Sequence, residues 1–410
     1  MTHRTRLLLA VTLGALFCAL FAVAPGFDNG FWRDDFVLLE RAEAARTQPS
    51  ILGARWVEPF NRPLAQVAFY LEYRLWGLDS GRYILTNTLL HVVNAVLLFW
   101  LLQTPLGAQA AAGAALLFAL GMGFYGKALL WAANLPDLLA TGFVLATGIA
   151  ATRAQLARLA PQRAAWMGVA GILFAMGLAC KESGVMAIVM VGGLMWPHRR
   201  SLGSMARKLV VLVMVCGVYV AFQLLNESGL GRVVHDPAVW LALPMRALRQ
   251  ATLMAIPVQA DSPLTAALGP LGARAVTLID QIRPALGLVF LGFGALAFWR
   301  GGGAVRWLLA SYCAFLLPFS LLHLPEGWLD IRYAYLPATC FCGLLAYSLR
   351  GLWMRAGRVR RMAVGLAVML AIAADLTLVR KLEAKYDGFG KSDESQEQLR
   401  NLQRRLSTHL

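Results

Sequence analysis

Two adjacent carboxylates, Asp34 and Asp35, stand in an otherwise apolar stretch, FWRDDFVLLE, shortly after the first long apolar segment. Consecutive residues do not share a face of a helix, so the two carboxylates are expected to have different roles. One can act as a general base, while the other fixes the loop or binds a partner. The alternative is a helix N-terminus with an acidic first turn, followed by a helix over 36–46.

Three basic side chains border apolar segments in separate parts of the chain: Arg62, Lys181 and Arg332. Guanidinium and ammonium groups hold phosphate oxygens through charge-assisted hydrogen bonds, which makes all three candidates for a phosphate site. Each also has a local alternative. Arg62 can stand at a helix start before a proline, Lys181 in a tight turn, and Arg332 in an ion pair with a nearby acid.

Polar and aromatic residues near these cations are candidates for a substrate pocket. Asn87, His91 and Asn94 are spaced four and three residues apart, so they share one face of a helix; the alternative for them is hydrogen bonding between helices. No second metal ligand stands at a suitable spacing from His91, and no metal site is predicted. The candidate pocket residues are Asn61, Asn87, His91, Asp137, Glu182, Tyr333 and Tyr335.

Composition places these residues in a membrane protein. Of the 410 residues, 59% are hydrophobic and 15% are charged, whereas soluble domains have about 45–50% and about 25%. An ordinary soluble enzyme, a disordered protein and a β-barrel porin are therefore excluded. The six cysteines lie in or beside apolar segments and are interpreted as packing residues. No glycine-rich phosphate loop, HExxH, GxSxG or CxxC motif is present, which argues against nucleotide chemistry on the cytoplasmic face.

The apolar segments predict an all-α polytopic membrane protein with about eleven transmembrane helices. The first is interpreted as an uncleaved anchor. A transmembrane domain over 1–380 and a short polar tail over 381–410, possibly helical, are expected. The predicted spans are 7–25, 83–102, 110–130, 135–151, 165–180, 184–197, 208–225, 284–299, 305–322, 333–349 and 362–379.

Basic residues orient these spans, because the arginine and lysine clusters before the first span and between spans four and five, six and seven, eight and nine, and ten and eleven all fall on one side of the membrane. The positive-inside rule then puts the N-terminus in the cytoplasm and the C-terminus outside. The long outer loops are 26–82, 226–283 and 323–332. Segment 241–258 is predicted to be an interfacial or re-entrant helix, since one further span there would move the later basic clusters outside.

Taken in order, these motifs resemble the type-C (GT-C) integral-membrane glycosyltransferases. The closest resemblance is to protein O-mannosyltransferases and to the transmembrane-and-TPR mannosyltransferases, here without TPR repeats. Tyr125, Lys127 and Leu135 depart from the family pattern, which has a His-Pro and a glutamate in the first region and an arginine at the third position. The resembling residues are Asp34-Asp35, Asn61-Arg62-Pro63-Leu64, Leu75-Trp76-Gly77-Leu78, Tyr83, Asn87, His91-Val-Val-Asn94, Trp131, Asp137, Lys181-Glu182-Ser183-Gly184 and Arg332-Tyr333-Ala334-Tyr335-Leu336-Pro337.

The resemblance implies a GT-C fold whose outer-face loops and interfacial helices form the active site. It implies an inverting transfer of a sugar from a polyprenyl-phosphate-linked donor to an acceptor hydroxyl, with Asp34 or Asp35 as base. Arg332, Lys181 and Arg62 would hold the donor phosphate, without a required cofactor, although a divalent metal is compatible. The acceptor would be protein, lipid or glycan on the periplasmic face of a bacterial inner membrane, with no nucleic acid involved. The alternatives are a transporter or flippase of a lipid-linked intermediate and an inactive relative.

Overall fold

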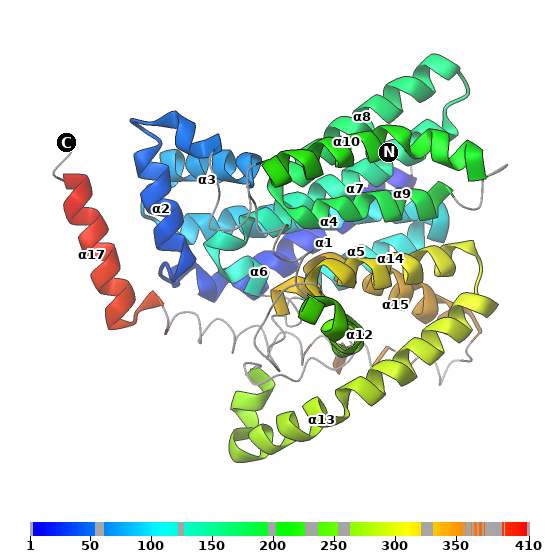
Figure 1. Cartoon of the computed structure of the whole chain (residues 1–410). Helices are drawn as coiled ribbons and strands as arrows, with labels where there is room; N and C mark the ends of the chain where they lie inside the picture. The colour runs from blue at the N-terminus through cyan, green and yellow to red at the C-terminus, as the bar shows by residue number, and fades with distance from the viewer. Residues whose placement is uncertain are drawn as a thin grey trace.

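The structure, a computed structural model of the whole chain, is helical wherever it is described (Figure 1). The regular structure in these residues consists of α-helices and short 3-10 helices, with no strand among them. The predicted all-α architecture is therefore confirmed. The described residues are 3–53, 61–121, 127–195, 202–225, 237–252, 263–320, 331–355, 390–407 and a few single positions between 357 and 388.

Five helices contain a segment long and apolar enough to cross a membrane: α1 (His3–Val23), α4 (Ser80–Leu106), α7 (Leu135–Leu156), α8 (Ala160–Cys180) and α13 (Pro263–Arg300). These helices make the chain a polytopic membrane protein. The predicted number of eleven spans stays a prediction, and its last segment, 362–379, lies largely outside the described residues. Other helices accompany the five: α5 (Ala108–Leu120), α9 (Ala187–Met195), α10 (Leu202–Leu225), α14 (Gly303–Ser320) and α15 (Tyr335–Arg355).

One predicted span, the third, is wrong for an identifiable reason. The predicted third span, 110–130, is interrupted because α5 ends before Gly121, and glycine favours helix ends. The chain then forms the short helices α6 (Lys127–Leu130) and η4 (Ala132–Asn134) before α7 begins. The predicted span 284–299 agrees with the apolar segment Gln281–Arg300 of α13, and this helix begins earlier, at Pro263, within the segment predicted as an outer loop.

Segment 241–258 falls partly within α12 (Pro237–Ala251), which packs against α13 and α14. The Tyr312 hydroxyl of α14 donates a hydrogen bond of 2.9 Å to the Ala251 carbonyl at the end of α12. A Cβ added at Gly287 would overlap the Leu248 carbonyl, so α12 and α13 are in close backbone contact. Whether α12 lies in the membrane interface stays a prediction, and residues 253–258 lie outside the described part.

The main apolar core lies between α1, α4, α5, α7 and α15. Small residues allow these helices to approach closely, as is usual for helix packing in membranes. A Cβ at Gly142 of α7 would lie only 2.7 Å from the Asn94 side-chain oxygen of α4. The buried alanines of α5 serve the same purpose: Ala110, Ala111, Ala112, Ala114, Ala115 and Ala119.

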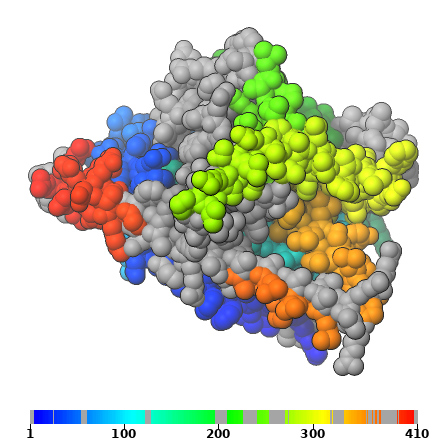
Figure 2. Space-filling view, turned by 90° about the horizontal axis from the view of Figure 1, so that it is seen from below, coloured from blue at the N-terminus to red at the C-terminus, as the bar shows by residue number. Residues whose placement is uncertain are grey.

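A second apolar core joins α2 (Asp34–Ala44), α3 (Pro63–Trp76) and the C-terminal helix α17 (Asp393–Ser407) at one end of the molecule. Leu402 of α17 is 4% exposed in this core, and Arg405 forms an ion pair of 3.1 Å with Glu40 of α2. Figures 1 and 2 both show α17 beside the blue N-terminal segment. The tail therefore contains a helix that docks on the first outer loop, at the far end of α1 from the N-terminus.

We expect the Gly390→Ala variant to loosen this docking. A Cβ at Gly390 would overlap the backbone of Gly30 in the first outer loop, whereas a Cβ at Gly388 would meet nothing within 4 Å. Trypsin should therefore cleave Gly390→Ala faster at Arg400 and Arg404 than it cleaves the wild type. Gly388→Ala is the control and should behave as the wild type. Equal cleavage rates for all three proteins would contradict this description of the contact.

Candidate functional site

The carboxylate pair begins helix α2 directly after a strained residue. Arg33 has φ 48° and ψ −112°, a conformation that residues with a side chain rarely adopt outside functional sites. Its guanidinium lies 4.6 Å from the centre of the Trp32 ring. This turn places Asp34 and Asp35 in the first turn of α2, where the helix dipole stabilises negative charge.

The structure separates the roles of the two aspartates. Asp35 is 2% exposed, and its carboxylate accepts hydrogen bonds from the backbone N–H groups of Trp32 (2.9 Å) and Ala133 (2.7 Å). Burial raises the pKa of Asp35 to about 8 in spite of these donors. Asp34 is half-buried, and no side chain or backbone group of the described residues forms a hydrogen bond or ion pair with its carboxylate. Asp35 therefore fixes α2 in place, and Asp34 is the better candidate for a base.

The segment around η4 connects the aspartates with the cations. Trp131 donates its indole N–H to the Trp32 carbonyl (3.2 Å), and the two rings lie 5.0 Å apart. Arg332 lies 4.9 Å from the centre of the Trp131 ring, and its guanidinium donates to the Asn134 side-chain oxygen at 3.5 Å. Together with the Ala133 N–H, these contacts make residues 131–134 a bridge between α2 and Arg332.

The three predicted cations are brought together at the end of this bridge. Lys181, 8% exposed, binds both carboxylate oxygens of Asp137 at 2.6 and 2.5 Å. Arg62 forms a two-point ion pair with Glu182 at 3.0 and 2.9 Å. Arg62 and Arg332 both lie close enough to repel the Lys181 ammonium. Among the described residues, the cluster brings three basic side chains together with the carboxylates of Asp137 and Glu182.

Two further predicted residues adjoin this cluster. The Tyr333 hydroxyl accepts a hydrogen bond of 3.1 Å from Arg332, and the Lys181 ammonium lies 5.5 Å from the Tyr333 ring centre. Asn61 is buried next to Arg62, and its backbone carbonyl accepts a hydrogen bond of 2.9 Å from Gln223 of α10. Segments far apart in the sequence thus meet around one group of charges.

Asn87, His91 and Tyr335 lie elsewhere, in the interior of the helix bundle. The Asn87 amide donates to the Trp131 carbonyl at 3.1 Å, and the His91 ring nitrogen Nδ1 lies 2.9 Å from the Tyr335 hydroxyl. Asn94 donates to the same hydroxyl at 3.1 Å. The contacts of His91 and Asn94 with Tyr335 are hydrogen bonds between helices, which is the alternative that the sequence left open. The pocket role of Asn87, His91 and Tyr335 stays a prediction. The hydrogen bond from Asn87 to the Trp131 carbonyl helps to hold Trp131 in place.

Sequence reasoning did not assign Trp32, Trp131 or Asn134 to the site. Both tryptophans stand close to an aspartate in the sequence, but tryptophans in apolar stretches are equally consistent with packing in the core. Among the departures from the family pattern, Tyr125 lies outside the described residues. Leu135 is buried at the start of α7 in the second apolar core, so that position supplies no cation.

The described residues contain no group of three His, Cys, Asp or Glu side chains that is close enough to hold a metal ion. The site is defined instead by cations and aromatic rings around a carboxylate. Whether the intact site uses a metal stays a prediction of the sequence.

The buried carboxyl group of Glu72 in α3 should make the stability of the folded protein depend on pH. This residue is 6% exposed, and burial raises its pKa to about 8, with a smaller contribution from Asp35. An unfolded glutamate has a pKa of about 4, so between about pH 4 and pH 8 the folded state holds a proton that the unfolded state has lost. Stability should therefore fall as the pH rises through this window.

Glu72→Gln is expected to reduce that loss, because an amide has no charge to bury. Its midpoint of thermal unfolding, followed by tryptophan fluorescence, should be higher than that of the wild type at pH 8 and similar at pH 4. Part of the decline should remain, since Asp35 titrates in the same direction. Glu394→Gln, in the exposed part of α17, is the control. A wild-type midpoint that is independent of pH would contradict this prediction.

Comparison with known proteins identifies the fold. No protein-family model and no curated protein sequence matches the chain. The archaeal oligosaccharyltransferase AglB from Archaeoglobus fulgidus, solved with an inhibitory peptide and a dolichol-phosphate, aligns with 93% of the chain at 15% identity and a TM-score of 0.55. An Archaeoglobus fulgidus oligosaccharyltransferase tethered with an acceptor peptide aligns with 93% at 13% identity and a TM-score of 0.56. ArnT from Cupriavidus metallidurans in the apo state aligns with 94% of the chain and 75% of its own length, at 14% identity and a TM-score of 0.49.

The chain spans 56% and 55% of the lengths of the two archaeal proteins. At these identities the likeness establishes the fold. The predicted GT-C-like membrane fold is therefore confirmed, and the activity and the resemblance to the mannosyltransferase subtype stay predictions.

Proposed function

We propose that the chain is a membrane glycosyltransferase that moves a sugar from a polyprenyl-phosphate-linked donor to an acceptor hydroxyl. The observation that carries the proposal is the convergence of Arg62, Lys181 and Arg332 beside the segment that holds the aspartate pair. The fold supports the donor class, because AglB shares it and was solved with a dolichol-phosphate.

The charge of the cluster suits such a donor. A polyprenyl-phosphate sugar is a phosphodiester with one negative charge, which clustered basic side chains can hold through charge-assisted hydrogen bonds. Arg332 contacts Tyr333, Asn134 and Trp131. We assign Arg332 to the donor phosphate because these contacts place it between the cluster and the segment that holds the aspartate pair. Charge on the phosphate grows as the sugar leaves, so a fixed cation there stabilises the transition state.

The aspartate pair supplies the other half of the reaction. The acceptor hydroxyl oxygen forms a bond to the anomeric carbon while the bond from that carbon to the phosphate oxygen breaks. Asp34 takes the hydroxyl proton, and polyprenyl phosphate leaves with the bonding electrons beside Arg332. A single displacement of this kind inverts the configuration of the anomeric carbon. Asp35 acts by positioning, since its carboxylate holds α2 against the Ala133 N–H.

The proposal places this site at the outer face of a bacterial inner membrane. The lipid tail of the donor then stays in the bilayer while its phosphate reaches the cluster at the boundary. The positive-inside rule supports this orientation, because the short basic connections fall on the side opposite α2. The acceptor is a hydroxyl group of a protein, lipid or glycan that approaches from the same face.

The function can be tested in cells by mass spectrometry of glycans and glycoproteins from a strain that lacks the gene. A sugar modification should be missing, and the wild-type gene should restore it while Asp34→Asn should not. Asp79→Asn is the matched control, because Asp79 is an exposed carboxylate of the same outer loop that pairs with Arg82 at 2.9 Å. An unchanged set of glycans, or restoration by Asp34→Asn, would count against the proposal.

A further inference from the structure

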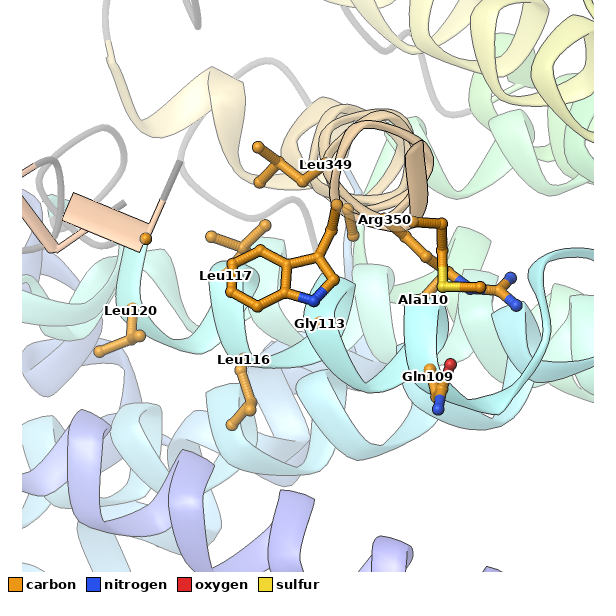
Figure 3. Close-up of a pocket in the computed structure, with 12 residues that line it drawn as sticks. Gln109, Ala110, Gly113, Leu116, Leu117, Leu120, Leu349 and Arg350 are labelled. Atoms are coloured by element: carbon orange, nitrogen blue, oxygen red, sulfur yellow. The ribbon is translucent and has the colours of Figure 1, made fainter. Parts of the chain in front are cut away.

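An apolar groove lies between α5 and α15, far from the candidate site. It has a volume of about 630 Å³ and is lined almost entirely by apolar side chains, among them Leu116, Leu117, Leu120, Leu349 and Trp353. Figure 3 shows Arg350 and Gln109 together at one end of the groove and Leu120 at the other. The groove therefore has an apolar length and one polar, positively charged end.

Helix α4 fixes the position of the groove relative to the site. The start of α4 packs against Phe27 in the outer layer, and its last residue, Leu106, accepts a hydrogen bond of 3.2 Å from the Arg350 guanidinium. The 27 residues of α4 span roughly 40 Å at about 1.5 Å per residue. That length exceeds a hydrocarbon core of about 30 Å. The charged end of the groove thus lies at the opposite membrane boundary from the aspartate pair.

The dimensions of the groove fit one leaflet of a bilayer. From Gln109 to Leu120 the wall formed by α5 extends for roughly 17 Å, about half of a hydrocarbon core of about 30 Å. Helices α5 and α15 meet closely behind it, since a Cβ at Gly113 would lie 3.5 Å from the Ala346 side chain. The groove is therefore a shallow channel that begins at the membrane boundary and ends near the midplane.

The charged end selects the headgroup of an occupant. Arg350 is exposed, and it carries the charge among the described residues that line the groove. The following stretch, 350–361, has five arginines and no acidic residue. Basic residues at the cytoplasmic boundary of membrane helices attract anionic lipids, and basic pockets between such helices bind their headgroups.

We infer that this groove binds one anionic glycerophospholipid of the leaflet opposite the candidate site, with an acyl chain along α5 and the phosphate at Arg350. The inference is independent of the proposed reaction, because it concerns another face of the molecule. The lipid would fill the space between α5 and α15 and hold two helices that contribute to the main core.

Native mass spectrometry of the full-length protein with added phosphatidylglycerol tests this inference. The wild type should retain one phosphatidylglycerol more tightly than phosphatidylethanolamine. Arg350→Gln should bind it about fivefold more weakly, as expected for about 1 kcal/mol per basic residue near a lipid surface. Arg350→Lys keeps the charge and should stay close to the wild type. Leu117→Trp keeps Arg350 but fills the groove, so it should lose the bound lipid.

Arg163→Gln is the matched control, because Arg163 is an exposed arginine that donates to the carbonyl of Ala157 at the same distance of 3.2 Å. Its binding should equal that of the wild type. Equal retention by the wild type, Arg350→Gln and Leu117→Trp would overturn the inference. Equal retention of phosphatidylethanolamine, or displacement of phosphatidylglycerol by polyprenyl phosphate at equal concentration, would overturn the identity of the occupant.

Discussion

Asp34→Asn is expected to slow sugar transfer by roughly 100- to 10,000-fold, the usual contribution of a positioned general base. The side chain keeps its shape but cannot take the hydroxyl proton. Because no described residue bonds its carboxylate, the folded state should be unaffected. The rate should be measured with a lipid-linked donor, and the midpoint of thermal unfolding should be measured on the same sample.

Asp35→Asn provides the comparison within the pair. The buried carboxylate of Asp35 accepts one hydrogen bond from the Trp32 N–H and one from the Ala133 N–H. An asparagine has only one side-chain oxygen, so its NH₂ group would face one of these two N–H donors. Leaving a buried donor without an acceptor costs about 1–3 kcal/mol. This variant should therefore unfold at a lower temperature and lose activity together with stability. Full activity in Asp34→Asn would show that the base has been assigned to the wrong residue.

Arg332→Gln is expected to lower kcat by roughly 10- to 100-fold, because hydrogen bonds to charged groups contribute about 1.5–3 kcal/mol. The effect should fall more on kcat than on KM, since the negative charge on the phosphate grows in the transition state. Kinetics with varied concentrations of the polyprenyl-phosphate donor separate the two constants.

Arg74→Gln is the matched control for this prediction. Arg74 donates to the Tyr70 hydroxyl at 3.0 Å and stacks on its ring, much as Arg332 does with Tyr333, but it lies on the exposed side of α3. Its removal should leave both constants unchanged. If Arg332→Gln also leaves the donor dependence unchanged, Arg332 does not hold the phosphate.

The cations of the site could be predicted from sequence because their chemistry is visible in their residue type. Arg62, Lys181 and Arg332 are charged residues at the edges of apolar segments, where an unused charge is costly. The structure brings all three together. Their partners were less visible: Glu182 and Asp137 were expected near the pocket, but the pairing of Arg62 with the first and Lys181 with the second depends on tertiary contacts.

The division of labour between Asp34 and Asp35 could not be predicted. The groups that hold Asp35 are backbone N–H groups, which every residue except proline carries, so no residue type marks them. The same limit applies to His91. Its helical face was evident, but its neighbour Tyr335 is 244 residues away, and one face of a helix serves a pocket and a helix contact equally well.

The ends of the helices were harder to predict than the apolar segments themselves. Helix α5 ends before Gly121, inside a largely apolar stretch, and residues 131–134 beyond this break form the bridge to α2. Helix α13 continues through Pro270 and Pro284 and begins before the predicted span 284–299. Hydropathy identifies the apolar segments well but does not by itself fix their ends.

The most direct test of the central claim is a transfer assay with the purified full-length protein in lipid nanodiscs. The donor is a polyprenyl-phosphate sugar with a labelled sugar, and free polyprenyl phosphate and labelled acceptor are measured together. The proposed function predicts that both products appear in equal amounts with the wild type and that both appear at least about 100-fold more slowly with Asp34→Asn. Intact donor that is never cleaved, or equal cleavage by the wild type and Asp34→Asn, would contradict it.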